Sequence, residues 1–181
     1  MARNFNAANT EYLSATATLV SAWGFSMACW FKLDLSSTSC VVSLCNNATD
    51  VGHYSLWVSG NTLGARAVNN SGSNATASIS GIVNNRWHFG GATFAGATSR
   101  TVYLDTSSSS NGTNVGVFQA RNTVAIGAQI GTMPLQLFTG ATALAAIWNV
   151  ALNADEMNAM AMGADPYKIR PQNLVGGWPM N

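Results

Sequence analysis

The stretch RWHFGGATFAGATSRTVYLD, residues 86–105, decides the fold that we expect for this chain. Its second half alternates apolar and polar side chains, with Val102 and Leu104 in the apolar row, which is the period of a strand with one buried face. Its first half carries aromatic side chains that strands favour, namely Trp87, Phe89 and Phe94. We predict two short strands joined by a glycine-rich turn, with Trp87, His88 and Asp105 on different faces and loops.

The same two-residue period recurs along the chain. Residues 25–33, FSMACWFKL, carry apolar side chains at every second position and indicate a central strand beside the core. Turn signals return about every eight to twelve residues, as in a protein of many short strands. Further strands are predicted at residues 41–44, 54–59, 63–68, 77–82, 87–94, 101–105, 115–119, 124–127 and 141–150. Polar loops are expected at residues 69–74 and 106–114, and the pair Asn111 and Gly112 predicts a hairpin turn.

One short helix is predicted near the carboxyl end. Asn153 followed by Glu156 three residues later is a capping-box pattern, and Gly163 is suited to the opposite end of the helix. The helix is expected over residues 154–162, with Met157 and Met160 packing against the edge of the sandwich.

Composition limits the classes of function. The 181 residues suit a single domain, residues 1–181, with a full core. Only 8% of the residues are charged and the net charge is +1, while Asn, Ser and Thr supply 53 residues, so we expect a polar but nearly uncharged surface. The arginines are scattered, which argues against nucleic acid as a partner. The sequence has no apolar run of about 18 residues and no secretory signal. We therefore expect the protein to be made in the cytoplasm and not to associate with a membrane.

The cysteines and histidines form no recognisable reactive group. Cys29, Cys40 and Cys45 lack the spacing of a zinc site and are predicted to be buried free thiols, with a Cys40–Cys45 bridge as the alternative. His53 and His88 have no nucleophile motif or ligand partner nearby in sequence and are interpreted as structural.

Four segments, taken in order, resemble the laminin-G-like branch of the concanavalin-A-like lectin and glucanase superfamily: FSMACWFKLD, RWHFGGATFAGATSRTVYLD, AIGAQ and FTGATALAAIWNVALNADEMNAMA. The resemblance covers residues 25–162 and implies an all-β, antiparallel two-sheet jelly-roll sandwich. It also implies that the first and last strands pair, joining residues 3–13 to residues 173–180. Thr106 departs from the family, which usually has Gly after the Asp, so the hairpin after Asp105 is expected to differ.

The resemblance has consequences for chemistry. Glycosidases of the superfamily carry an array of acidic residues on one strand, because two carboxyl groups must flank the bond that is cleaved. Glu11 and Glu156 are the two glutamates and form no such array, so we expect no enzymatic activity and no cofactor. Many relatives hold a calcium ion at a loop rim, bound by aspartate and backbone oxygens. Asp50 and Asp105 are the candidate calcium ligands in this sequence, but both are isolated acids, and Asp105 is assigned to a turn instead.

The two ends of the chain, MARNFN and GADPYKIRPQNLVGGWPM, resemble compact laminin-G-like proteins of tailed bacteriophages. This implies a location in the virion, and the low charge favours a capsid decoration (cement) protein that binds the major capsid protein and neighbouring copies, with a trimer as the expected oligomer. The alternative is a tail, fibre or receptor-binding lectin that recognises a bacterial surface glycan. Its candidate contacts are Trp57, Asn69, Asn70, Asn74 and Asn111, whereas Trp30, Trp87 and Trp148 are assigned to the core.

Overall fold

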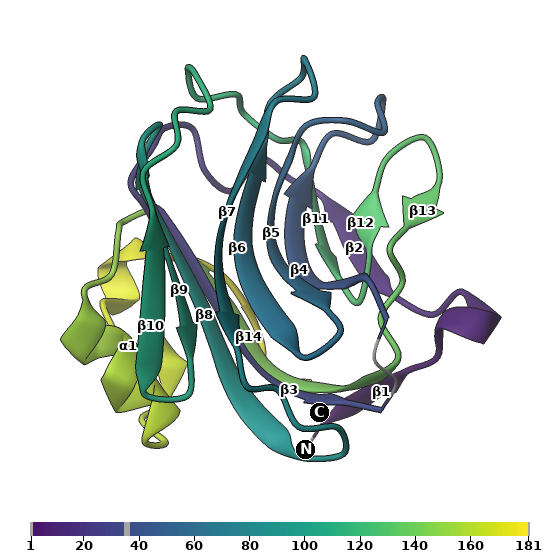
Figure 1. The fold of residues 1–181 in the computed structure, drawn as a ribbon, viewed down its shortest axis with the longest axis vertical. Helices are drawn as coiled ribbons and strands as arrows, with labels where there is room; N and C mark the ends of the chain where they lie inside the picture. Colours follow the sequence, from purple (N-terminus) through teal and green to yellow (C-terminus); the bar gives the residue numbers. More distant parts are fainter. Residues whose placement is uncertain (1, 35–36, 181) are drawn as a thin grey trace.

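Two antiparallel β-sheets pack face to face in the computed structural model, which describes residues 2–34 and 37–180 (Figure 1). The seven-stranded sheet has the order β1 (Arg3–Phe5), β14 (Gly140–Trp148), β3 (Phe25–Leu33), β8 (Trp87–Gly96), β9 (Ser99–Leu104) and β10 (Ser107–Asn111), and β15 (Leu174–Trp178) also pairs with β14. The six-stranded sheet has the order β2 (Leu13–Thr16), β11 (Thr123–Ile126), β4 (Ser39–Cys45), β5 (His53–Ser59), β6 (Thr62–Val68) and β7 (Asn74–Ser80). The predicted all-β, two-sheet jelly-roll sandwich is confirmed.

The main core lies between the two sheets. Alternate residues of β3, among them Phe25 and Phe31, face inward and meet Leu44 and Leu56 of the opposite sheet in one buried cluster. β3 pairs on both sides, with β14 and β8, and is the central strand that its apolar alternation predicted. Cys29, Cys40 and Cys45 are buried free thiols, as predicted, and the bridge between the last two is not formed.

A second core covers part of the outer face of the seven-stranded sheet. Helix α1 (Ala154–Ala161) lies beside the seven-stranded sheet (Figure 1). It begins with the predicted capping box and buries Met157 and Met160. These methionines lie over the outer face of the sheet with Trp148, not at its edge. A Cβ atom on Gly91 would lie 2.8 Å from the sulfur of Met157, so a glycine in β8 allows the helix to pack closely. The short 3-10 helices η1 (Ala7–Asn9), η2 (Pro166–Lys168) and η3 (Pro171–Asn173) lie near the chain ends.

The first and last strands do not pair with each other as expected. β1 pairs with residues 140–142 of β14, and β15 pairs with residues 145–148 of the same strand. β14 is nine residues long and therefore offers both ends of one edge to the two short strands. β2 belongs to the other sheet, where it pairs with β11.

Two local predictions on the carboxyl side of residue 104 are wrong. The hairpin turn is at Asp105 and Thr106, where Leu104 pairs with Ser107, and residues 107–111 form β10 instead of a loop. Asp105 adopts a left-handed conformation with φ of 53°, which an Asp tolerates better than most residues. The predicted strand at residues 115–119 is absent, because Phe118 instead stacks on Tyr54 from a loop, with ring centroids 5.6 Å apart.

Two expectations about residues 86–105 also change. Trp87 is 39% exposed and does not belong to the core. His88 and Asp105 are not separated, since His88 Nδ1 lies 2.8 Å from Asp105 Oδ2 while Asp105 Oδ1 accepts a hydrogen bond from the Phe89 amide. The turn bends Asp105 back onto β8, which simple strand alternation does not anticipate. His88 Nε2 accepts from the Val83 amide, so the pair fixes local structure, as the structural interpretation of His88 requires.

Candidate functional site

The outward side chains of β5, β6 and β7 form one polar surface. The strand register places Ser55, Arg66 and Thr76 in one row and Trp57, Gly64 and Ser78 in the next. The residues between them face the main core, because successive side chains of a strand point to opposite sides. We call this surface the polar face and define it by His53, Ser55, Trp57, Arg66, Thr76 and Ser78.

Trp57 lies half-buried at the centre of the polar face. A Cβ atom on Gly64 would come within 3.1 Å of the Trp57 ring and 2.8 Å of Thr76 Cγ2, so the indole lies close over the glycine backbone. On the same ring, the Arg66 guanidinium carbon is 5.5 Å from the ring centroid, within the range of a cation–π contact. The absence of a side chain at Gly64 therefore lets the indole lie close to the sheet, with Arg66 beside it.

Several polar atoms of this face are buried without a partner. His53 is 4% exposed, and within the described part of the chain neither of its ring nitrogens has a hydrogen-bond partner. The Ser55 hydroxyl and the Trp57 Nε1 group are in the same condition. Burial, with Arg66 and Arg121 nearby, lowers the pKa of His53 from 6.5 to about 3, so the imidazole is uncharged at neutral pH. The face therefore holds donors and acceptors that the fold does not use.

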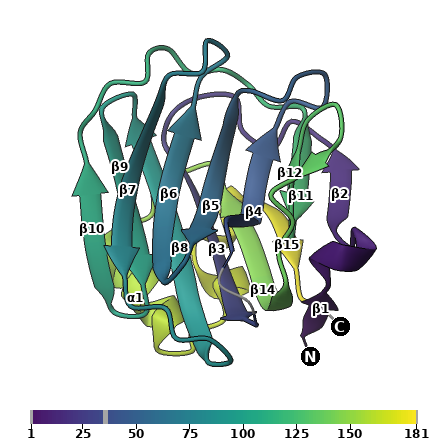
Figure 2. The same ribbon diagram turned by 45° about the vertical axis from the view of Figure 1, so that its right-hand side comes forward.

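A small two-stranded element covers the side of the six-stranded sheet next to the polar face. It consists of β12 (Gln129–Ile130) and β13 (Pro134–Leu135), which pair with each other. β12 lies beside β11 and β4 (Figure 2). The Ile130 amide donates to Cys45 Sγ, and Cys40 Sγ donates to Gln136 Oε1 at 3.2 Å. Outward side chains are accessible mainly over β6 and β7, where Arg66 and Thr76 are half-buried and Ser78 is exposed, whereas His53 and Ser55 of β5 are buried.

The asparagines predicted to bind glycan are placed apart from Trp57. Asn69 and Asn70 lie in the turn after β6, and Asn69 is about 17 Å along the strand from Gly64, the partner of Trp57. Asn69 Oδ1 accepts from two amides of its own turn, while Asn70 and Asn111 each accept from a buried arginine at 2.7 and 2.6 Å. Asn74 is exposed at the start of β7. Three of these four amides therefore stabilise loops.

Arg66 is not among the site residues predicted from the sequence, and His53 is predicted there to have only a structural role. Both stand at outward positions of β5 and β6, in the segments HYSLWVS and TLGARAV, where the two-residue period is visible. The signal that could have shown them is the register, which aligns Ser55 with Arg66 across the two strands.

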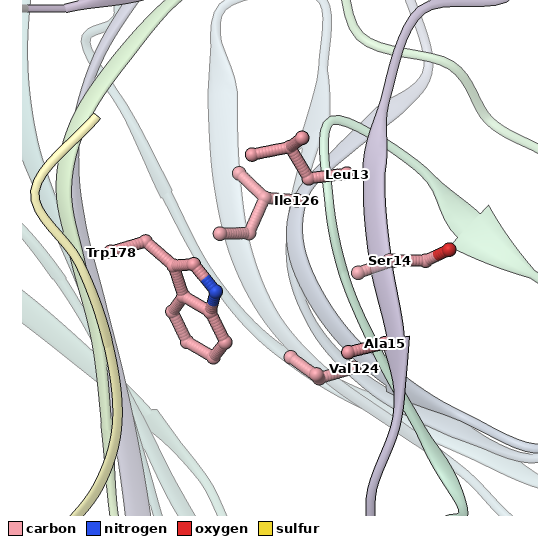
Figure 3. A pocket seen from close by; sticks show the side chains of 7 residues that line it. Leu13, Ser14, Ala15, Val124, Ile126 and Trp178 are labelled. Atoms are coloured by element: carbon pink, nitrogen blue, oxygen red, sulfur yellow. The ribbon is translucent and has the colours of Figure 1, made fainter. Parts of the chain in front are cut away.

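Two further surfaces are hollowed and apolar. A slot of about 160 Å³ lies between β2 and β11 of one sheet and Trp178 of the other, where the indole faces Val124 and Ile126 and the Ser14 hydroxyl points away (Figure 3). On the outer face of the seven-stranded sheet, an open hollow is lined by Ala2, Trp30, Trp87, Ala143 and Leu144. We call the second surface the Trp30–Trp87 patch.

Acidic side chains do not gather at any of these surfaces. Residues 51–104, which include β5, β6 and β7, contain no Asp or Glu. Asp50 accepts hydrogen bonds from the amide and hydroxyl of Thr132, and Asp105 is engaged by His88. Over residues 2–34 and 37–180, no three His, Cys, Asp or Glu side chains are grouped as metal ligands would be. No helix of the described residues has the length and apolar character needed to cross a bilayer.

Comparisons with known proteins agree with this architecture. Several solved structures share the fold at low sequence identity. A serum-amyloid-P-like pentraxin of Limulus polyphemus is 23% identical, with a TM-score of 0.66, 83% of this chain covered and 75% of the other. The CBM40 domain of a Ruminococcus gnavus sialidase, solved with α2,3-sialyllactose, is 12% identical, with a TM-score of 0.68 and coverage of 78% and 84%. The NanB sialidase of Streptococcus pneumoniae is 13% identical, with a TM-score of 0.70, and the match covers 87% of this chain but 27% of that enzyme.

At these identities the structural likeness shows the fold alone, and no curated protein matches the chain. A family model described as concanavalin A-like lectin/glucanases superfamily, Laminin_G_3, matches residues 7–158, which is most of the sequence. Together with the two-sheet sandwich, this match shows that the chain belongs to the concanavalin A-like lectin/glucanase superfamily, in its laminin-G-like branch.

Proposed function

We propose that this chain is a non-catalytic glycan-binding domain and that the polar face is its binding site. The observation that carries the proposal is the half-buried Trp57 indole set beside buried donors and acceptors that have no partner in the described part of the chain. A sugar ring has an apolar C–H face that can stack on an indole, and hydroxyl groups that both donate and accept hydrogen bonds. Sites for small ligands commonly combine an apolar wall with a few convergent polar groups.

The chemistry of the face suits binding without turnover. The neutral His53 imidazole offers one donor and one acceptor, and the Ser55 hydroxyl offers both. Glycoside hydrolysis needs two carboxyl groups on either side of the scissile bond, and β5, β6 and β7 carry none. The CBM40 relative, whose solved complex holds sialyllactose, supports the assignment of glycans as the ligand class.

A glycan array tests the proposal with two tryptophan variants. The wild-type chain is expected to bind a subset of glycans, and Trp57→Ala is expected to weaken that binding at least tenfold because the stacking surface is removed. Trp87→Ala removes an exposed indole from the opposite sheet and should leave binding unchanged. Absence of binding to every glycan, or equal losses in both variants, would contradict the proposal, and hydrolysis of a bound glycan would contradict its non-catalytic part.

A second candidate is a structural protein of a phage virion, such as a capsid decoration protein that binds the major capsid protein and neighbouring copies, in trimers. The Trp30–Trp87 patch favours it, because an exposed indole beside Leu144 and Ala143 is a surface that gains from burial against another protein. The scarcity of charge lowers the desolvation cost of such docking.

Purified phage particles distinguish this candidate from a tail or fibre lectin. A decoration protein is expected in a copy number that is a regular fraction of the major capsid protein, whereas a receptor-binding lectin would be found in a few copies at the tail. Trp87→Ala should reduce occupancy of the capsid, with Trp57→Ala as the control. If particles lack the chain, the virion proposal is wrong in both forms.

A further inference from the structure

We infer that the glycan held by the polar face carries a carboxylate and that Arg66 binds this group, an inference that rests on the proposed function. Arg66 stands in the middle row of the face, between Ser55 and Thr76. It is the charged side chain of β5, β6 and β7, which contain no acidic residue that could neutralise it.

Arg66 differs from the arginines that the fold uses. The Arg100 guanidinium donates to Asn111 Oδ1 and to the carbonyls of Ala97 and Thr113, at distances of 2.6 to 2.7 Å. Arg100 is 1% exposed and ties the end of β10 and the segment after it to the turn between β8 and β9.

Arg121 is used in the same way, since its guanidinium donates to Asn70 Oδ1, the Val68 carbonyl and Gln119 Oε1. Arg170 pairs with Glu156. By contrast, among residues 2–34 and 37–180 Arg66 has neither an ion pair nor a hydrogen bond, and its guanidinium carbon lies over the Trp57 ring, 5.5 Å from the centroid.

This contact positions the guanidinium for a ligand. The cation–π contact keeps the guanidinium over the indole, and the described part of the chain uses none of its N–H donors. A carboxylate matches the edge of a guanidinium with two parallel hydrogen bonds, and charge-assisted bonds of this kind are shorter and stronger than neutral ones. A sugar acid whose ring stacks on Trp57 would bring its carboxylate to the adjoining Arg66.

The surroundings favour an anionic group over a cationic or neutral one. The burial of His53 keeps the neighbouring imidazole uncharged, so Arg66 supplies the formal charge of the face. With the nearest acidic residues in sequence at positions 50 and 105, both already hydrogen-bonded, no carboxylate of β5–β7 competes for the guanidinium.

Titration calorimetry with matched ligands tests the inference. The probes are α2,3-sialyllactose and a glucuronic-acid-terminated disaccharide, each with its methyl ester, together with 3′-sulfated lactose. At least one acid is expected to bind the wild-type chain ten times more tightly than its ester. Arg66→Gln should remove most of the difference between acid and ester, because it should lower the affinity for the acid about tenfold more than the affinity for the ester. Arg66→Lys should restore part of the difference, because it keeps the charge but loses the two-pronged geometry.

Arg86→Gln is the matched control, because Arg86 is exposed outside the polar face and its loss changes the net charge equally. If Arg86→Gln has the same effect as Arg66→Gln, or if acid and ester bind equally while Trp57→Ala abolishes both, the carboxylate inference is wrong although the glycan-binding proposal stands. If the sulfated probe binds as tightly as the acid, the site recognises anions in general, and the carboxylate inference is wrong. If neither these probes nor any arrayed glycan binds, the proposed function itself fails.

Discussion

The buried imidazole of His53 should make the stability of this protein fall on acidification. In the folded state burial lowers its pKa to about 3, whereas in the unfolded chain the value returns to 6.5. Below pH 6.5 the unfolded state therefore binds a proton that the folded state does not accept. The stabilising contribution is present above pH 6.5 and is lost as the pH falls from 6.5 towards 3.

The size of the effect follows from the two pKa values. The free energy of unfolding should decrease by about 2 kcal/mol between pH 7.5 and pH 5, and by about 3 kcal/mol by pH 4, from this residue alone. Carboxyl groups elsewhere also titrate at these pH values, so the wild-type chain by itself does not isolate the contribution of His53 to the free energy of unfolding. His53→Leu has a similar volume and no titratable group, and the difference between the two proteins gives the contribution of His53.

The assay is urea unfolding followed by tryptophan fluorescence at pH 7.5, 6, 5 and 4. At pH 7.5 the variant should lie within about 1 kcal/mol of the wild type, because the ring nitrogens that it loses have no partner in the described structure. At pH 5 the variant should have gained about 2 kcal/mol relative to the wild type. Parallel pH curves for the two proteins would show that His53 is solvated or paired and would refute the reasoning.

Three further predictions concern stability. Trp148 is fully buried and its indole donates to the Ile169 carbonyl. Trp148→Ala should therefore lower the free energy of unfolding, measured by chemical denaturation, by about 3 to 5 kcal/mol, and Trp87→Ala by only about 1 to 2 kcal/mol. Equal losses would contradict the placement of the two indoles. Ala15→Ile should partly fill the slot beside Trp178 and raise the free energy of unfolding by about 1 kcal/mol, and a lower melting temperature would show that the slot has no room. Asn153→Ala should cost about 1 kcal/mol through loss of the helix cap, and an unchanged melting temperature would argue against the cap.

The parts of the fold that local patterns predicted correctly are those where one period dominates. The strand at residues 25–33 was located to the residue, because its apolar alternation is uninterrupted, and the capping box of Asn153 and Glu156 located the start of the helix. The prediction failed at residues 107–111, where polar serines form a strand because β9 pairs with them across a two-residue turn. The strand predicted at residues 115–119 is also wrong, because Phe118 stacks on Tyr54 from a loop.

The candidate site was only partly accessible to sequence reasoning. Trp57 was named in advance, but the asparagines proposed to accompany it stabilise turns, and Arg66 was not singled out. Amide side chains in polar loops look alike in sequence whether they bind a ligand or cap a turn. The difference lies in which donors the rest of the protein already uses.

Local patterns and composition were enough to predict the all-β sandwich, the central strand, the helix and its cap, the free thiols and the low charge. Each of these depends on composition or on residues that are close together in the chain. The three-dimensional arrangement was needed to show that Trp87 is exposed, that His88 contacts Asp105, and that both terminal strands pair with β14. It also placed Trp57 beside Arg66 and left His53 buried without a partner. The physical reason is that strand register and the packing of one sheet on another bring together side chains from different strands, and no local period records which of them will meet.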